Sequence, residues 1–358
     1  MLTLNIPQIK TMLLDGHRLD EPLMIWGPPG GGKSDGVLQA AAEVDAFVCE
    51  IRLSSYESVD LHGLPDTLEQ YAHWKPPVTM PFVVDGKPNP HFPTDRPIWL
   101  FFDEVTSASQ GVFAVLYQLT LGRAVNEHKL MDNVYVVLAG NRESDRGVVN
   151  RMPTPLSNRL THVEAGIDRD AWVYDFAIPN EVHPVGIAFV QMDKAHLYNF
   201  DPASGEKAFA TPRSMAKAFK YFADDKMDDL IKQAMIHGAI GSGMASQFLG
   251  FAEVWKDIIP PKQVLKDPEG TPVPDETKLS TRWAMAVAIS GEMDADTAGA
   301  FHTYLKRLGA EYVTTAWSMA VRRDQKAEER GKPNPKPVEQ SDAFMDFAED
   351  YRVLWKRD

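Results

Sequence analysis

Gly27-Pro28-Pro29-Gly30-Gly31-Gly32-Lys33-Ser34 fits the pattern G-x-x-x-x-G-K-[ST] at every position. The apolar run Leu23–Trp26 precedes it, and apolar residues recur at helical spacing between Ser34 and Val44. The pattern thus stands between a predicted strand and a predicted helix, where glycines let backbone N–H groups wrap a phosphate chain. We expect a phosphate-binding loop in which Lys33 reaches the β- and γ-phosphates of a nucleotide and Ser34 binds Mg²⁺.

A second apolar strand ends in two acids. Ile98–Phe102 is apolar throughout, and Asp103 and Glu104 follow it directly, roughly 70 residues after the loop. In this context we expect Asp103 beside the Mg²⁺ and Glu104 placed to orient and deprotonate an attacking water. A carboxylate in that position favours hydrolysis over transfer of the phosphoryl group to another acceptor.

Polar residues further along the chain complete the set of candidates. Asn141 stands just past the apolar strand Val134–Ala139, where an amide can hold the lytic water or touch the γ-phosphate, although Asn there is also typical of a turn. Arg151, Arg159 and Arg213 are candidates for neutralising charge on phosphate oxygens, in cis or in trans.

Composition excludes several classes of protein. The 358 residues carry 37 Lys and Arg against 50 Asp and Glu, a net charge of −13, which makes nucleic acid an unlikely default partner. The single cysteine, Cys49, excludes an internal disulfide framework and fits a small buried residue in a reducing compartment. The ten histidines show no metal-binding spacing. Apolar runs are too short for a membrane span, so we expect a soluble, cytoplasmic protein.

Short apolar runs alternate with longer mixed segments in the first half of the chain, as in βα units around a parallel sheet, and helical patterns follow after about residue 167. Pro212 is predicted to open a helix with Thr211 as its N-cap. The segment 281–323 reads as helical with one break near 291–294, and 342–355 as a terminal amphipathic helix.

Together these motifs resemble those of the AAA+ ATPases, and specifically their MoxR branch. Gly27–Ser34 is similar to Walker A, Leu100–Glu104 to Walker B, and Asn141 to sensor 1. Arg159 resembles the arginine finger contributed to a neighbouring subunit. Arg213, at the start of a predicted lid helix, resembles sensor 2.

Other segments resemble the MoxR branch in particular. Asp60-Leu61-His62-Gly63 is similar to its D-[LI]-x-G element, 54–96 to its insertion into helix 2, and 120–133 to its hairpin before sensor 1. The stretch from Gly140-Asn141-Arg142 to Asn158-Arg159-Leu160 is especially similar to MoxR proteins encoded beside von Willebrand factor A-domain partners. Within the insertion, four residues could line a pore or equally pack the insertion: Tyr71, His73, Trp74 and Lys75.

One position departs from the family pattern. Many MoxR proteins have Arg-Phe at the finger, whereas this chain has Arg159-Leu160. The arginine itself is retained, and Arg146 or Arg151 could share or replace its role.

The resemblance, which covers about residues 1–250, implies an α/β P-loop AAA+ core at 1–165 and an all-α lid at 166–255. The pattern of the remaining residues predicts a helical C-terminal extension with a Pro-rich connector at 256–358. It further implies Mg²⁺-dependent ATP hydrolysis by a ring, most simply a hexamer, that remodels or matures a protein complex with a von Willebrand factor A-domain adaptor. The alternatives are an ATP-gated scaffold with little turnover, a nucleic-acid motor on the same core and, more distantly, a P-loop kinase.

Overall fold

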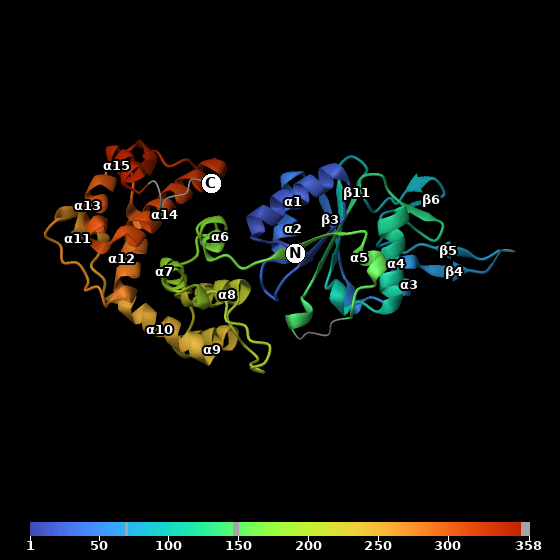
Figure 1. Ribbon diagram of the computed structural model, residues 1–358, viewed down its shortest axis with the longest axis horizontal. Helices are drawn as coiled ribbons and strands as arrows, with labels where there is room; N and C mark the ends of the chain where they lie inside the picture. Colours follow the sequence, from blue (N-terminus) through green and yellow to red (C-terminus); the bar gives the residue numbers. More distant parts are fainter. Residues whose placement is uncertain (69–70, 146–149, 352–358) are drawn as a thin grey trace. The chain divides into compact units, whose positions relative to one another are not determined.

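The computed structural model describes residues 1–68, 71–145 and 150–351 (Figure 1). The chain divides into two compact units, Met1–Ile167 and Asp168–Asp358. The first contains all the strands of the described residues, and the second is helical. This agrees with the change of pattern expected near residue 167.

The first unit is built on a six-stranded sheet whose neighbouring strands are all parallel. Its spatial order is β1-β12-β2-β11-β8-β3. The strands are β1 (Thr3–Leu4), β2 (Leu23–Trp26), β3 (Phe47–Arg52), β8 (Ile98–Asp103), β11 (Val134–Gly140) and β12 (Thr161–Ala165). The expected α/β fold with a parallel sheet is therefore confirmed.

Helices cover both faces of this sheet (Figure 1). One face carries α1 (Ile6–Leu19) and α2 (Lys33–Glu43), and the other carries α3 (Ser58–His62), α4 (Gln110–Gly122) and α5 (Thr154–Ser157). The sequence of strand β8 is apolar throughout because alternate residues point to opposite faces of the sheet and both faces are buried. Leu100 and Phe102 pack on the α4 side, whereas Phe101 packs on the α1 and α2 side.

The stretch 54–96 carries small elements of its own, as its length suggests. Strands β4 (Leu64–Asp66) and β5 (His73–Lys75) form an antiparallel hairpin. A separate four-stranded sheet has the order β7-β6-β10-β9. Its members are β6 (Phe82–Val84), β7 (Lys87–Pro88), β9 (Ala124–Val125) and β10 (His128–Leu130). The insertion is thus joined to the hairpin β9–β10 that precedes β11.

Trp74 packs the insertion. Its ring meets the His62 ring edge-on with centroids 4.6 Å apart. Its backbone N–H donates to Glu127 Oε1 at 2.6 Å, and its carbonyl oxygen lies 2.7 Å from His128 Nε2. Tyr71, by contrast, is 72% exposed near the end of the β4–β5 hairpin. The two roles considered for these side chains are lining a pore and packing the insertion. The contacts of Trp74 are those of a residue that packs the insertion.

The second unit consists of helices. They are α6 (Arg169–Ala171) with the π-helical turn Trp172–Ala177, α7 (Pro184–Met192), α8 (Pro212–Phe222), α9 (Asp229–Ile240), α10 (Ser242–Lys256), α11 (Pro261–Lys266), α12 (Leu279–Glu292), α13 (Ala298–Leu308), α14 (Ala310–Glu329) and α15 (Asp342–Asp350). Thr211 caps α8 in a capping box with Ser214, as predicted. Helix α12 packs against α7 and α10, so the helices after residue 256 are in contact with those before it.

The helical segment 281–323 has one break more than the sequence predicts. Besides the break after α12, Gly309 separates α13 from α14 with a φ of 125°. That angle lies in the region that favours glycine. The chain turns at this glycine, and no proline or cluster of polar residues in the sequence indicates the turn.

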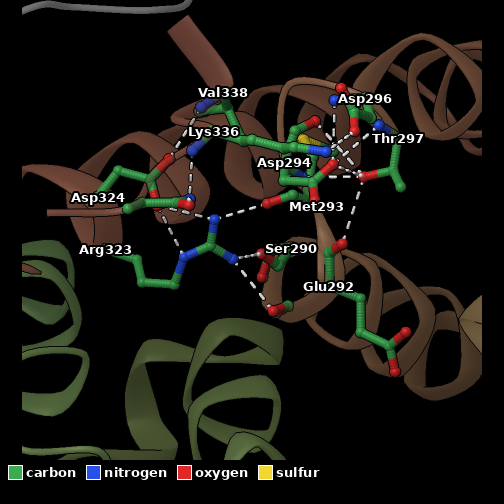
Figure 2. Close-up of polar contacts among 12 residues, drawn as sticks. Ser290, Glu292, Met293, Asp294, Asp296, Thr297, Arg323, Asp324, Lys336 and Val338 are labelled. Carbon is green, nitrogen blue, oxygen red and sulfur yellow. Dashed lines mark hydrogen bonds and ion pairs between the residues drawn. The ribbon is translucent and has the colours of Figure 1, made fainter.

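Figure 2 shows the polar contacts that join α14 to the end of α12 and to the segment that follows α14. The buried Asp324 carboxylate on α14 accepts from the Arg323 guanidinium at 2.9 Å, from Asn334 Nδ2 at 3.0 Å and from the Val338 N–H at 2.9 Å. Arg323 in turn donates to the carbonyl oxygens of residues 290, 291 and 293 at the end of α12. One ion pair thus ties three chain segments together.

Among the helices of the described ranges, none has both the length and the apolar character needed to cross a lipid bilayer.

Candidate nucleotide-binding site

The phosphate-binding loop connects β2 to α2. Gly30 and Gly32 adopt φ values of 69° and 91°, which glycine reaches without steric cost. Gly27 has another reason to lack a side chain, because a Cβ there would lie 2.9 Å from Ala165 Cβ. Its N–H donates to the Gly140 carbonyl oxygen at 3.2 Å, which joins the start of the loop to the end of β11.

Lys33, the first residue of α2, is only 8% exposed. Its ammonium donates to the carbonyl oxygens of Gly27 at 2.8 Å and Pro28 at 3.0 Å, and to Asn141 Oδ1 at 3.0 Å. A buried cation needs such partners, since desolvation disfavours an unpaired charge. The predicted lysine and the predicted strand-end amide are therefore in contact.

Ser34 and Asp103 form the second contact of the site. Ser34 Oγ donates to Asp103 Oδ2 at 2.7 Å, and Asp103 Oδ1 accepts from the Glu104 N–H at 2.8 Å. A hydroxyl and a carboxylate are hard oxygen ligands, and Mg²⁺ usually takes only one or two ligands from the protein beside phosphate and water oxygens. The pair fits that requirement. Within the described ranges no group of three or more His, Cys, Asp or Glu side chains could hold a metal ion by itself.

Glu104 is exposed and adopts a left-handed backbone with φ 55° and ψ 35°. This conformation costs a non-glycine residue about 1–2 kcal/mol, and such strain concentrates at functional sites. The hydrogen bond from its N–H to the Asp103 side chain helps to hold it. The chain turns sharply there, so that the Glu104 side chain leaves the end of β8 instead of following the strand.

These residues meet because the carboxyl ends of parallel strands lie at one edge of a sheet. Strand β11 lies between β2 and β8, so Asn141 follows the strand between the loop and the two acids. The sequence-predicted residues Lys33, Ser34, Asp103 and Asn141 are thereby brought together, with Glu104 directly after Asp103.

Two arginines at the same edge were not predicted. Arg142 donates to Asp145 Oδ1 at 3.0 Å and to Glu164 Oε1 at 2.9 Å, which joins the loop after β11 to β12. Arg52 lies level with Asp103 on the neighbouring strand. Its hydrogen bond to Glu50 raises the pKa of the guanidinium, and the charge of Asp103 adds to this effect. In the sequence, the only signal that could have identified these two arginines as site residues is their position at the ends of predicted strands.

Arg159 lies at the opposite edge of the sheet from the loop. It stands two residues before β12, and Thr161 of that strand pairs with Leu23, the first residue of β2. The length of β2, roughly 13 Å, therefore separates it from Gly27. Its guanidinium lies over the Tyr117 ring at 4.4 Å and donates to the Pro155 carbonyl oxygen at 2.6 Å. Arg159 cannot reach the phosphate loop of its own chain from there.

The remaining arginine candidates are less constrained. Arg151 is exposed and makes no hydrogen bond or ion pair with its side chain to the residues that the structure describes, and the same holds for Arg213 at the start of α8. Arg213 belongs to the second unit, so its predicted role toward the nucleotide stays a prediction. Arg146 lies outside the described residues.

The strand order, the loop between β2 and α2, and the acids after β8 define the fold as an α/β core of the P-loop type, followed by a helical part. No model of a known protein family matches the chain, and no curated protein matches its sequence.

Solved structures with a similar fold include a putative ATPase from Cytophaga hutchinsonii, 13% identical over 90% of this chain and 84% of its own, with a TM-score of 0.36. A RuvB mutant from Thermotoga maritima is 14% identical over 84% of this chain and 87% of its own, with a TM-score of 0.36. NtrX from Brucella abortus, in complex with ADP, is 11% identical over 97% of this chain and 68% of its own, with a TM-score of 0.35. Because similarity this low carries no functional information, the site has to be interpreted from its own residues.

Proposed function

We propose that this chain is a Mg²⁺-dependent ATPase that hydrolyses ATP to ADP and phosphate. The observation that carries the proposal is the convergence of Lys33, Ser34, Asp103 and Asn141 at one edge of the sheet, directly beside Glu104. A glycine loop at a helix N-terminus, a buried ammonium and a hydroxyl–carboxylate pair in one place supply what the binding of a Mg²⁺–phosphate group requires.

Each group has a defined task in this reaction. The loop N–H groups and the Lys33 ammonium bind and orient the phosphate oxygens. Ser34 and Asp103 would hold Mg²⁺, which neutralises charge on the β- and γ-phosphates when bound. Glu104 takes a proton from the attacking water, and the Asn141 amide orders that water or the γ-phosphate. Positioning and charge neutralisation together lower the barrier to phosphoryl transfer.

We further propose that the active site is completed by a second copy of the chain. Arg159 lies at the sheet edge away from its own loop, so a role in catalysis requires the loop of a neighbour. In that arrangement its guanidinium leaves Tyr117 for the γ-phosphate, or the neighbour's nucleotide approaches it there. A ring of identical subunits, most simply a hexamer, provides one such contact for every site.

The MoxR resemblance supports the finer proposal. The insertion at 54–96 and its junction with the β9–β10 hairpin agree with the elements expected of that branch. On this basis the ATPase remodels or matures a protein complex together with a von Willebrand factor A-domain protein. Arg213 would report the state of the γ-phosphate to the helical unit.

Steady-state ATPase rate per subunit, measured against protein concentration with Mg²⁺ present, tests these proposals. We expect a specific activity that rises steeply and then levels off as sites are completed by neighbours. Glu104→Gln should bind ATP and not hydrolyse it. Glu181→Gln is a matched control, because Glu181 is also an exposed glutamate with a left-handed backbone, φ 53°, and belongs to none of the predicted motifs.

Three other outcomes would redirect the proposal. Normal hydrolysis by Glu104→Gln would remove the role assigned to that carboxylate. A constant rate per subunit at high dilution, from a protein shown to be monomeric there, would remove the trans arginine. ATP binding without turnover at any concentration would favour the ATP-gated scaffold.

A further inference from the structure

Three side chains form a hydrogen-bonded series across the first unit. Trp26 Nε1 donates to His162 Nδ1 at 2.9 Å, and the planes of the two rings differ by 19°. His162 Nε2 lies 2.8 Å from the Ser157 carbonyl oxygen and 3.1 Å from Ser157 Oγ. All three residues are partly buried, so the series is shielded from bulk water.

The chemistry of the donors fixes the state of the imidazole. The indole N–H of Trp26 can only donate, so Nδ1 of His162 has to accept and carries no proton. The proton of the neutral ring then sits on Nε2 and is donated to the Ser157 carbonyl oxygen, which can only accept. Both ring nitrogens are used, and the orientation of His162 is determined from two sides.

The ends of this series lie beside two parts of the proposed ATPase that are at opposite edges of the sheet. Trp26 is the last residue of β2 and is followed directly by Gly27, the first residue of the phosphate loop. Ser157 is the last residue of α5, two positions before Arg159. His162 belongs to β12, the neighbour of β2, and pairs with Met24. The series therefore runs from one edge of the sheet to the other along the boundary between β2 and β12.

The turn that carries Arg159 is flanked by Leu156 and Leu160, which are buried in the same core cluster as Met24 of β2. The N–H groups of Asn158 and Arg159 bond back to Thr154 and Leu156 within the same short segment. The Arg159 guanidinium also bonds within it, to the Pro155 carbonyl oxygen. Besides its contact with Tyr117, this segment is related to β2 by that packing and by the strand pairing that begins at Thr161. The series through His162 adds a side-chain link that reaches the end of β2 directly before the loop.

We propose that His162 is a positioning residue that couples nucleotide occupancy in one subunit to the placement of Arg159 toward the next subunit. The inference rests on the proposed function, since it needs Arg159 to act in trans. When phosphates order the loop, the end of β2 and the Trp26 ring are fixed with it. His162 passes this order to Ser157, and the Arg159 turn is held ready for the neighbouring site.

A mixing experiment separates this role from support of the chain's own loop. Wild-type subunits are mixed with an excess of Glu104→Gln subunits or of Glu104→Gln/His162→Phe subunits, neither of which hydrolyses ATP itself. We expect the double variant to lower hydrolysis per wild-type subunit by roughly 2- to 30-fold relative to the single variant, the range typical of coupling residues. Equal hydrolysis in the two mixtures would overturn the proposal.

The control for packing is His17→Phe in the same Glu104→Gln background. His17 is also a partly buried histidine against a tryptophan, with its ring centroid 5.7 Å from that of Trp99, but it has no route to α5. It should behave like Glu104→Gln alone. Trp26→Phe provides a second variant that keeps an aromatic ring and loses the donated hydrogen bond together with part of the indole volume. It should reproduce the effect of His162→Phe, and combining both should add little, as expected for one shared interaction.

A second measurement does not depend on turnover. Hydrogen exchange of the segment 154–160 is compared with and without ADP. Exchange should slow on ADP binding in the wild type and in His17→Phe, and the slowing should be lost in His162→Phe. The same slowing in His162→Phe, or none in the wild type, would contradict the coupling. A chain that binds ADP but never hydrolyses ATP would refute the proposed function, and the exchange result alone would then decide the coupling.

Discussion

The Ser34 hydroxyl donates to the Asp103 carboxylate at 2.7 Å, although 69 positions separate the two residues in the chain. The contact joins the first turn of α2 to the end of β8 across the intervening strand β11. The two proposed metal ligands therefore satisfy each other's hydrogen-bonding needs. The fold positions the two side chains relative to each other, because each residue lies at the end of a helix or a strand.

This pairing leads to a prediction about metal removal. Chelating Mg²⁺ should abolish ATP hydrolysis, and adding Mg²⁺ back should restore it, because the charge on the phosphates is then neutralised again. The melting temperature of the nucleotide-free protein should hardly change, since Ser34 and Asp103 remain paired without metal. ATPase assays and thermal melts with and without chelator test this. A large loss of stability on chelation would indicate a structural metal elsewhere.

The second prediction concerns Arg159. Arg159→Ala should retain ATP binding and lose hydrolysis by roughly 10³-fold or more, the range known for arginines supplied in trans. Nucleotide binding is followed by titration with a fluorescent ATP analogue, and hydrolysis by phosphate release. Arg151→Ala is the competing variant, because Arg151 is an exposed arginine eight positions earlier and the other described candidate for the trans role, and Arg18→Ala is the control, since Arg18 is an exposed arginine of the same unit that pairs with Asp15. If Arg151→Ala is inactive and Arg159→Ala is active, the finger has to be reassigned.

Much of the site could be predicted because its residues stand at the ends of strands. The glycine loop, Asp103, Glu104 and Asn141 are each recognisable from an apolar run and the residues just after it. Parallel strands then bring these ends together without further information. The same local patterns gave the two-part fold, since helical and βα rhythms differ in period.

Other contacts depend on register, which no local pattern contains. Arg142 reaches Glu164 only because β12 lies beside β2 with Glu164 level with Trp26. The contact between Trp26 and His162 spans 136 positions and follows from the same register. The missed break at Gly309 has a different cause, because a single glycine inside a helical pattern is more often tolerated than used as a stop.

The third prediction concerns the ion pair of Figure 2. Asp324→Ala should destabilise the protein by about 3 kcal/mol or more, because it removes a buried carboxylate and leaves Arg323 and the Val338 N–H without that partner. Asp296→Ala is the control: Asp296 is exposed and pairs with the exposed Lys336, so its loss should cost about 1 kcal/mol or less. Urea unfolding measures both. Equal costs would show that the buried pair does not hold the C-terminal helices.

The fourth prediction is a pH dependence of stability that involves His302. This side chain is 5% exposed, and its Nδ1 accepts from Trp317 Nε1 at 3.1 Å. Burial lowers the pKa of His302 below the ordinary value of 6.5, and the charge of Lys306 lowers it further, against smaller opposite effects of Asp346 and Asp350. The folded state therefore keeps a neutral imidazole at a pH where the unfolded chain already binds a proton.

The sign follows from this difference. The contribution of His302 to stability is fully present above about pH 6.5 and is lost as the pH falls toward its lowered pKa, with a slope of at most about 1.4 kcal/mol per pH unit. His302→Gln keeps an acceptor for the Trp317 N–H and does not titrate, so its free energy of unfolding should fall less between about pH 7 and about pH 5. Burial also lowers the pKa of His17 and His183, but both remain in the variant, so the difference between the two curves isolates His302. His91→Gln is the control: His91 is exposed, so the stability of this variant should follow the wild-type curve. If the His302→Gln curve also runs parallel to the wild-type curve, His302 does not resist protonation in the folded state.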